Sequence, residues 1–186
     1  MLGPNKYMSK TDKEIPEEKA FGEFLDIFNK ETDRGAALTA AAFLDQTLYE
    51  ILKSFFLDVN ESQELLEGGG AVLGTFSARI NMCYCLGLIQ ENEYRELNIF
   101  RKIRNEFGHK WKNISFETQK INDLCFNLPW VGSIELKEYS LKARNRFNFA
   151  VVILLTDLLW RPQVIQNEKR TSKIYRERKQ LKLNPP

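Results

Sequence analysis

The most constraining feature of this sequence is an apolar segment, FNFAVVILLTDLLW, which runs from residue 147 to residue 160. Up to Leu155 its helical wheel is apolar on almost every side, as in a helix buried in a protein core. The segment is too short to cross a bilayer, and Asn148 and Asp157 interrupt it. We therefore expect a core helix over 140–160 and no membrane association.

Apolar residues at helical spacing recur along the rest of the chain, whereas the alternation typical of strands is almost absent. A glycine-rich turn at 67–74 lacks the Gly-Lys-Ser/Thr ending of a phosphate loop, and Pro162 interrupts the last helix. The fold class predicted is all-α, a single-domain helical bundle. Besides the core helix, the predicted helices cover 16–30, 34–59, 75–89, 91–108 and 115–128.

The sequence divides into three regions: a polar, loose segment over 1–14, a helical domain over 15–160, and a basic C-terminal extension over 161–186. The extension holds eight basic and two acidic residues, a net charge of +6. The whole chain carries +2, so the remainder carries −4. This asymmetry fits either a tail that binds a polyanion or a solvated terminal helix.

The three cysteines, Cys83, Cys85 and Cys125, all lie among apolar residues. Cys83 and Cys85 would point to nearly opposite sides of a helix, which makes them a poor metal-binding pair. The first residues lack the apolar run of a signal peptide. We expect reduced core cysteines, no metal or cofactor, and a cytoplasmic protein.

Packing does not explain a group of polar residues on the helix predicted over 91–108. Ile103 and Phe107 define its buried face, and Arg104 lies at the edge of that face. Asn105 and His109 are stacked one turn apart, so they can touch. One helix cannot direct all three polar side chains at a single atom, but a two-fold related pair of helices could.

These three residue types suit RNA cleavage without a metal. Histidine serves as general acid or base near neutral pH, so His109 would exchange protons with the ribose 2′-hydroxyl and the leaving oxygen. Arg104 would stabilise the scissile phosphate, and Asn105 would orient the imidazole. The product would carry a 2′,3′-cyclic phosphate. Further attraction for a nucleic-acid backbone would come from Arg101, Lys102, Lys110 and Lys112.

The pattern Arg104-Asn105-x-x-x-His109 resembles the signature of the HEPN superfamily. That resemblance implies a homodimeric endoribonuclease in a regulatory, toxin–antitoxin or phage-defence setting, with RNA as substrate and an antitoxin or other protein as partner. Three segments also resemble the mannitol operon repressor (MltR) family, within a region from Phe24 to Leu128. They are DRGAALTAAAFLDQTL, LGTFSARINMCYCLGLI and FRKIRNEFGHKW. This second resemblance implies a non-catalytic transcriptional regulator or a protein-interaction module.

The same polar residues can also be explained by structural roles alone. His109 would be favourable simply as a cation near a helix C-terminus, and Arg104 could pair with Asp45 or Glu106. Asp45 and Arg79 lie within otherwise packed helices, so we expect them to form a structural ion pair. No helix-turn-helix is recognisable. The endoribonuclease is our first expectation, and the regulator is the alternative.

Overall fold

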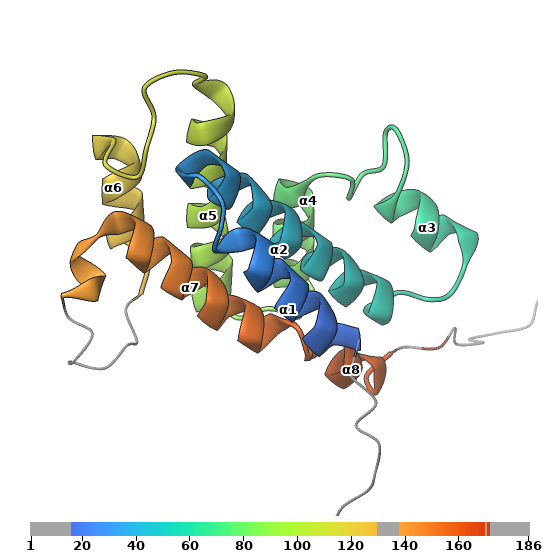
Figure 1. Cartoon of the computed structure of the whole chain (residues 1–186). Coiled ribbons are helices and arrows are strands. Elements are labelled where there is room, and N and C mark those ends of the chain that lie inside the picture. Colours follow the sequence, from blue (N-terminus) through green and yellow to red (C-terminus); the bar gives the residue numbers. More distant parts are fainter. Residues whose placement is uncertain (1–15, 130–137, 170, 172–186) are drawn as a thin grey trace, which may run out of the picture.

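Helix α2 (Asp33–Phe55) runs through the middle of the molecule and packs against α1, α3, α4, α5, α7 and α8 (Figure 1). Thr32 caps its start, because the side-chain oxygen accepts a 3.1 Å hydrogen bond from the Gly35 N–H. Four small residues in its first half, Ala36, Ala37, Ala40 and Ala41, are buried. They let neighbouring helices approach α2 closely.

The computed structural model describes residues 16–129, 138–169 and 171, and these contain helices and no strand. The all-α bundle expected from the sequence is therefore confirmed. Around α2 lie α1 (Pro16–Phe28), α3 (Asn60–Leu66), α4 (Phe76–Cys85), α5 (Glu91–His109), α6 (Gln119–Phe126), the 3₁₀ turn η2 (Tyr139–Leu141), α7 (Ala143–Leu158) and α8 (Arg161–Gln166). The proposed loose segment 1–14 and most of the basic extension lie outside the described residues.

Helix α7 is a core helix, as its composition predicted, with seven buried residues. Phe147 lies at the centre of an aromatic cluster. Its ring centroid is 4.9 Å from that of Phe116, 5.4 Å from that of Phe100 and 6.3 Å from that of Phe28. These rings come from α1, α5, α7 and the segment before α6, so this cluster joins parts of the chain that are distant in sequence.

By length and composition alone, one stretch among the described residues could cross a membrane: Ala143–Gln166, which comprises α7 and α8. It is longer than the segment considered from the sequence. A helix in a protein core meets the same criterion, because burial and a bilayer both select apolar side chains. In this fold the buried side chains of α7 belong to the hydrophobic core of the bundle, which accounts for its apolar composition.

Several helix boundaries differ from those predicted; the helix expected over 16–30, for example, ends at Phe28, and the one expected over 75–89 ends at Cys85. The helix expected over 34–59 ends at Phe55, because Phe56 is extended, and a separate helix α3 follows. The helix expected from Ser115 begins at Gln119, since the Thr118 hydroxyl accepts from the Ser115 N–H in a local turn. The core helix begins at Ala143, after η2, rather than at residue 140.

The expectation that all three cysteines are core residues is wrong for Cys85, which is exposed on the last turn of α4. Cys83 and Cys125 are buried and free. Burial raises the pKa of each of these two thiols to about 12. The two buried thiols are therefore packing groups.

Candidate functional site

The structure brings together only part of the Arg104, Asn105 and His109 group. Arg104 is exposed, and its guanidinium donates a 3.1 Å hydrogen bond to the side-chain oxygen of Asn105. His109 is exposed at the last residue of α5 and makes no hydrogen bond to either residue. A depression of about 520 Å³ between α5 and α6 is lined by Asn105, but not by Arg104 or His109. Within one chain, Arg104 therefore contacts Asn105 and His109 stands apart, whereas the helical wheel stacked Asn105 with His109 and set Arg104 to one side.

The carboxylates suggested as partners for Arg104 are engaged elsewhere. Glu106 accepts a short hydrogen bond from Lys120, and the Lys110 ammonium lies 3.8 Å from its other oxygen. The bond from Lys120 is the largest cause of a lowered pKa at Glu106. Asp45 is paired with Arg79. Among the described residues, the Arg104 guanidinium therefore bonds to the neutral Asn105 side chain and to no carboxylate, and Arg104 is exposed to solvent.

Arg34 changes the electrostatics at the end of α5. Its guanidinium donates to the carbonyl oxygen of Phe107 at 2.6 Å and to that of Lys110. These carbonyls belong to the end of α5, where the partial negative charge of a helix accumulates. The bonds satisfy them and place a cation on that end. The role of Arg34 could not be predicted from the sequence, because both of its partners are more than 70 residues away.

A cationic surface surrounds this end of α5, which we call the α5 surface. Of the four predicted nucleic-acid-binding residues, three are exposed here, and Arg101 is half-buried and donates to Asn98. Trp111 is 78% exposed, far from the core, and the Lys112 ammonium lies 4.1 Å from the centre of its ring. The α5 surface comprises Lys102, Arg104, His109, Lys110, Trp111 and Lys112.

Asp45 and Arg79, proposed from the sequence as an ion pair, lie 2.8 Å apart between α2 and α4. The Arg79 guanidinium also donates to the Leu66 carbonyl at 3.3 Å and lies 5.3 Å from the centre of the Tyr49 ring. These contacts hold the end of α3 against the bundle. One oxygen of Asp45 and the Nε of Arg79 are buried without a hydrogen-bond partner.

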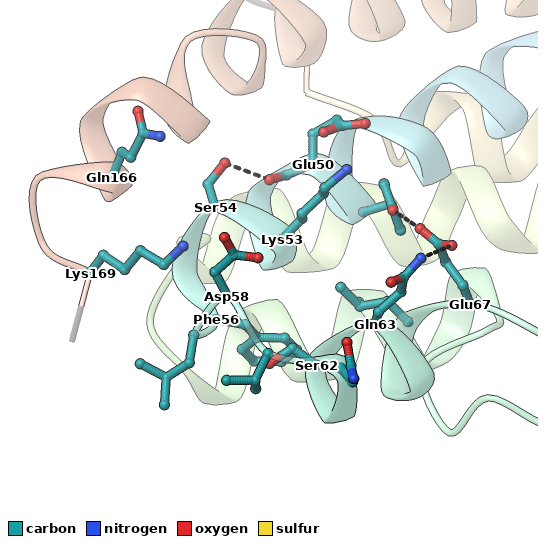
Figure 2. Close-up of a pocket in the computed structure, with 15 residues that line it drawn as sticks. Glu50, Lys53, Ser54, Phe56, Asp58, Ser62, Gln63, Glu67, Gln166 and Lys169 are labelled. Atoms are coloured by element: carbon teal, nitrogen blue, oxygen red, sulfur yellow. Dashed lines mark hydrogen bonds between the residues drawn. The ribbon is translucent and has the colours of Figure 1, made fainter. Parts of the chain in front are cut away.

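A cavity of about 460 Å³ lies between the end of α2, α3 and the end of α8, and we call it the α3 cavity. Figure 2 shows Lys53 and Glu67 among the polar side chains that line it. The Tyr49 hydroxyl donates a short hydrogen bond to Glu67, and this bond is the largest cause of a raised pKa at Tyr49. Apolar side chains are also exposed around α3: Leu57 (40%), Val59 (46%), Leu65 (40%) and Val72 (70%).

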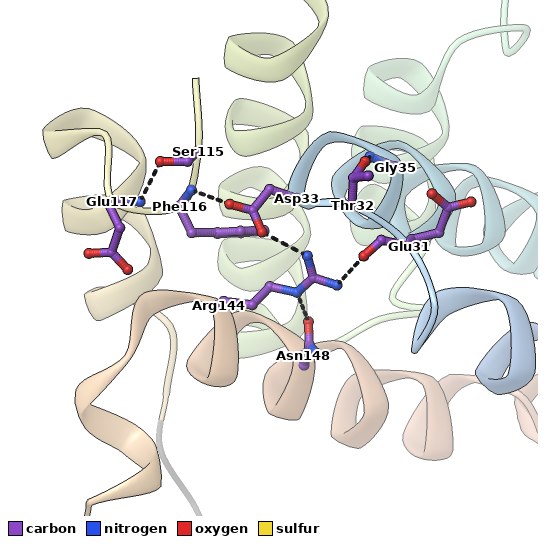
Figure 3. Close-up of polar contacts among 9 residues, drawn as sticks. All are labelled: Glu31, Thr32, Asp33, Gly35, Ser115, Phe116, Glu117, Arg144 and Asn148. Carbon is purple, nitrogen blue, oxygen red and sulfur yellow. Dashed lines mark hydrogen bonds and ion pairs between the residues drawn. The ribbon is translucent and has the colours of Figure 1, made fainter. Parts of the chain in front are cut away.

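Arg144 joins three distant segments of the bundle, as Figure 3 shows. It lies 3.0 Å from Asp33 and donates to the Glu31 carbonyl at 3.2 Å and to Asn148 at 2.9 Å. Asp33 in turn accepts a 3.1 Å bond from the Phe116 N–H. The guanidinium lies 5.3 Å from the centre of the Phe116 ring. This group fixes the start of α2 against α7 and the segment that leads into α6.

At the other end of α5, Glu93 is almost fully buried and forms two parallel hydrogen bonds with Arg161 of α8. Glu93 also accepts from the Gln90 N–H at 2.6 Å, which caps the start of α5. Nearby, burial raises the pKa of Glu96 to about 7, and the negative charges of Glu93 and Asp157 act in the same direction. Arg161, the first residue of the predicted extension, is therefore bound to the helical domain.

Comparison with known proteins indicates which interpretation holds. A family model described as MtlR, mannitol repressor, matches residues 24–174. The mannitol operon repressors of Escherichia coli K12 and of Escherichia coli O6:H1 are each 28% identical to this chain over 126 residues. These matches cover 64% of this chain and 65% of each relative, so the chain spans just under two thirds of their length.

A solved structure of the MtlR–HPr complex from Escherichia coli shares this fold, with a TM-score of 0.50 and 23% identity. The match covers 78% of this chain and 97% of that one. The first expectation, a HEPN-like endoribonuclease, is wrong: the match across the domain is to repressors, and it outweighs a six-residue motif. The resemblance to repressors, expected over 24–128, continues to residue 174. This chain belongs to the mannitol repressor family.

Proposed function

We propose that this chain is a non-catalytic transcriptional regulator of the repressor type, acting in the cytoplasm through a protein partner. The observation that carries the proposal is the family match over residues 24–174, which spans α2 to α8 without interruption. The named relatives are mannitol operon repressors. In this function Arg104, Asn105 and His109 have no catalytic role and act as polar surface groups.

The proposed partner is HPr, because the structural relative was solved as an MtlR–HPr complex. We place the contact on the exposed apolar side chains around the α3 cavity. Protein interfaces combine apolar contacts at their centre with a polar rim. Here Leu57 and Val59 provide the apolar contacts, and Lys53 and Lys169 supply charge at the rim.

We further propose that the regulatory domain extends through α8 rather than ending at residue 160. Arg161 supports this because it binds Glu93 and also donates to the Leu88 carbonyl at 3.1 Å. Ile165 is buried among the core residues. The basic extension would then begin after α8. The homodimer suggested by the sequence stays a prediction, which light scattering of the purified chain can check.

Two measurements test the function. Deleting the gene in its native host should raise the transcript level of that host's mannitol operon, and re-expressing the chain should restore repression. Purified chain should bind the host's HPr, and Val59→Glu should weaken that binding at least tenfold. Leu141→Glu is the matched control, since Leu141 is an equally apolar residue, 65% exposed, on η2. Unchanged transcript together with no HPr binding would refute the proposal.

A further inference from the structure

A groove of about 420 Å³ lies between the turn that joins α4 to α5 and one side of the path from the end of α7 into α8; we call it the α8 groove. Asp157, Trp160, Val164 and Glu168 line it and recur every three or four residues, so they share one side of that helical path. Trp160 is 37% exposed and Val164 is 60% exposed. Because tryptophan is highly buried on average, two exposed apolar side chains in one groove favour contact with a further segment of protein.

The carboxylates of the α8 groove have no cation beside them. Among the described residues, Asp157 and Glu168 form no ion pair. Arg161 is the only cation that lines the groove, and it is already bound to Glu93 by two parallel hydrogen bonds. At the nearby Glu96, burial raises the pKa most, and the charges of Glu93 and Asp157 raise it further. The groove therefore combines apolar contact with unbalanced negative charge.

A partner for this groove should be basic and should carry apolar side chains. The segment over residues 172–186, SKIYRERKQLKLNPP, has that composition, although it lies outside the described residues. It contains five basic residues and one acidic residue, a net +4, and its apolar and aromatic residues are Ile174, Tyr175, Leu181 and Leu183. Charge complementarity of this kind gives specificity to a contact.

The tether between the groove and this segment is short. Three residues, 169–171, separate Glu168 from residue 172. A short flexible tether holds a segment at an effective concentration of about millimolar, so weak contacts are sufficient. From Glu168 back to Asp157 the helical path measures at most about 17 Å. Residues 173–182 could span up to about 33 Å, so the segment is long enough to follow the whole groove.

The other end of the chain fits the groove less well. Glu17 accepts a 3.2 Å hydrogen bond from Gln163, so the start of α1 lies beside α8. The segment over residues 1–14 therefore also leads to this region. It contains three basic and two acidic residues, a net charge of only +1. Charge favours the C-terminal segment as the occupant.

We propose that residues 172–186 dock in cis in the α8 groove, with basic side chains beside Asp157 and Glu168 and apolar side chains on Trp160 and Val164. Exposed ion pairs contribute little each, so the apolar contacts supply much of the binding, and charge selects the segment. Docking covers the basic charges of the extension and withholds them from an external polyanion. The groove shares no lining residue with the α3 cavity, so this inference is independent of the proposed HPr contact.

Cys85 provides a probe for the test, because it is exposed and lies two residues before Gly87, which lines the groove. Burial raises the pKa of the other two thiols to about 12, so a thiol-reactive nitroxide should label Cys85 alone. On the full chain at about 50 mM salt, this label should broaden the amide NMR signals of residues 172–186. Most of that broadening should be lost in Asp157→Asn/Glu168→Gln, and in wild type at about 1 M salt.

Two controls accompany the measurement. Glu61→Gln/Glu64→Gln neutralises two exposed carboxylates on α3 and should retain the broadening. Cys85→Ser/Glu117→Cys moves the label to an exposed residue before α6 and should leave the signals of residues 172–186 sharp. Circular dichroism checks that each variant is folded. Sharp signals in the labelled wild type, or equal broadening in the Asp157/Glu168 variant, overturn the proposal.

The same experiment identifies the occupant. Isotope-labelled Cys85→Ser chain is mixed with spin-labelled chain that carries no isotope, and residues 172–186 should then stay sharp. Broadening in this mixture would show that the segment docks on a second copy, which contradicts docking in cis. Broadening of residues 1–14 in place of residues 172–186 would assign the groove to the other end of the chain and would equally reject the proposal.

Discussion

Glu93 and Arg161 are joined by two parallel hydrogen bonds, each 2.7 Å long, between the first turn of α5 and the first residue of α8. The Glu93 side chain is 4% exposed and that of Arg161 is 19% exposed. Removing one partner of such a pair leaves a buried charge uncompensated, whereas removing both partners does not. The stability of the bundle should therefore depend on the pair as a unit.

Arg161→Met is expected to destabilise the chain by about 3–5 kcal/mol, because Glu93 loses its cation. The double variant Glu93→Gln/Arg161→Met should recover much of that loss. Urea unfolding followed by circular dichroism measures both. If the effects of Glu93→Gln alone and Arg161→Met alone add up to that of the double variant, the two residues are not coupled.

The raised pKa of Glu96 predicts a pH-dependent effect of Glu96→Gln. The folded-state pKa is about 7, above the ordinary 4.5, so the stability contributed by the protonated group is complete below pH 4.5 and is lost as pH rises through 7. Glutamine avoids this loss. After allowing for partial solvent screening, the variant should be about 1–2 kcal/mol more stable than wild type at pH 8.

At pH 4.5 the same substitution should change stability little, because Glu96 is then largely protonated when folded. Thermal melting at the two pH values provides the comparison. Glu91→Gln is the control, since Glu91 is an exposed carboxylate on the same helix. An equal gain at both pH values would contradict a titrating Glu96.

Arg144→Ala should destabilise the bundle by about 1–3 kcal/mol, since Asp33 and the Glu31 carbonyl both lose a charged donor. Arg144→Lys should restore only part of this, because an ammonium cannot reproduce the planar guanidinium contacts with Asp33 and Asn148. Chemical unfolding measures the loss. Lys142→Ala, an exposed neighbour, should have almost no effect.

Thiol labelling should distinguish Cys85 from the other two cysteines. Native chain at pH 8 should react quickly with Ellman's reagent at one thiol, because Cys85 is exposed while burial raises the pKa of Cys83 and Cys125 to about 12. Unfolding in guanidinium should release all three. Cys85→Ser should abolish the fast reaction, and fast labelling that persists in this variant would contradict the assignment.

The sequence predicted the all-α class and the core position of Phe147, because periodicity and composition report burial directly. It did not predict α3, since the break after Phe55 contains neither glycine nor proline. The Glu93–Arg161 pair was also missed, because its members are 68 residues apart.

The candidate site was less predictable than the fold. The positions of Arg104, Asn105 and His109 on one helix were correct, but a short motif could not decide between catalysis and a polar surface. The likeness to repressors rested on longer segments and held when the whole domain was compared. The contact of Arg34 was not predicted, because its partner is a backbone carbonyl at a helix end. Every residue has such a carbonyl, so the sequence does not mark this one as a partner.

Helix α2 also keeps the α5 surface and the α3 cavity apart. Its 23 residues make a rod about 34 Å long. Arg34 near one end reaches the α5 surface, and Lys53 near the other lines the α3 cavity. Two macromolecules bound at these ends would not compete for the same side chains.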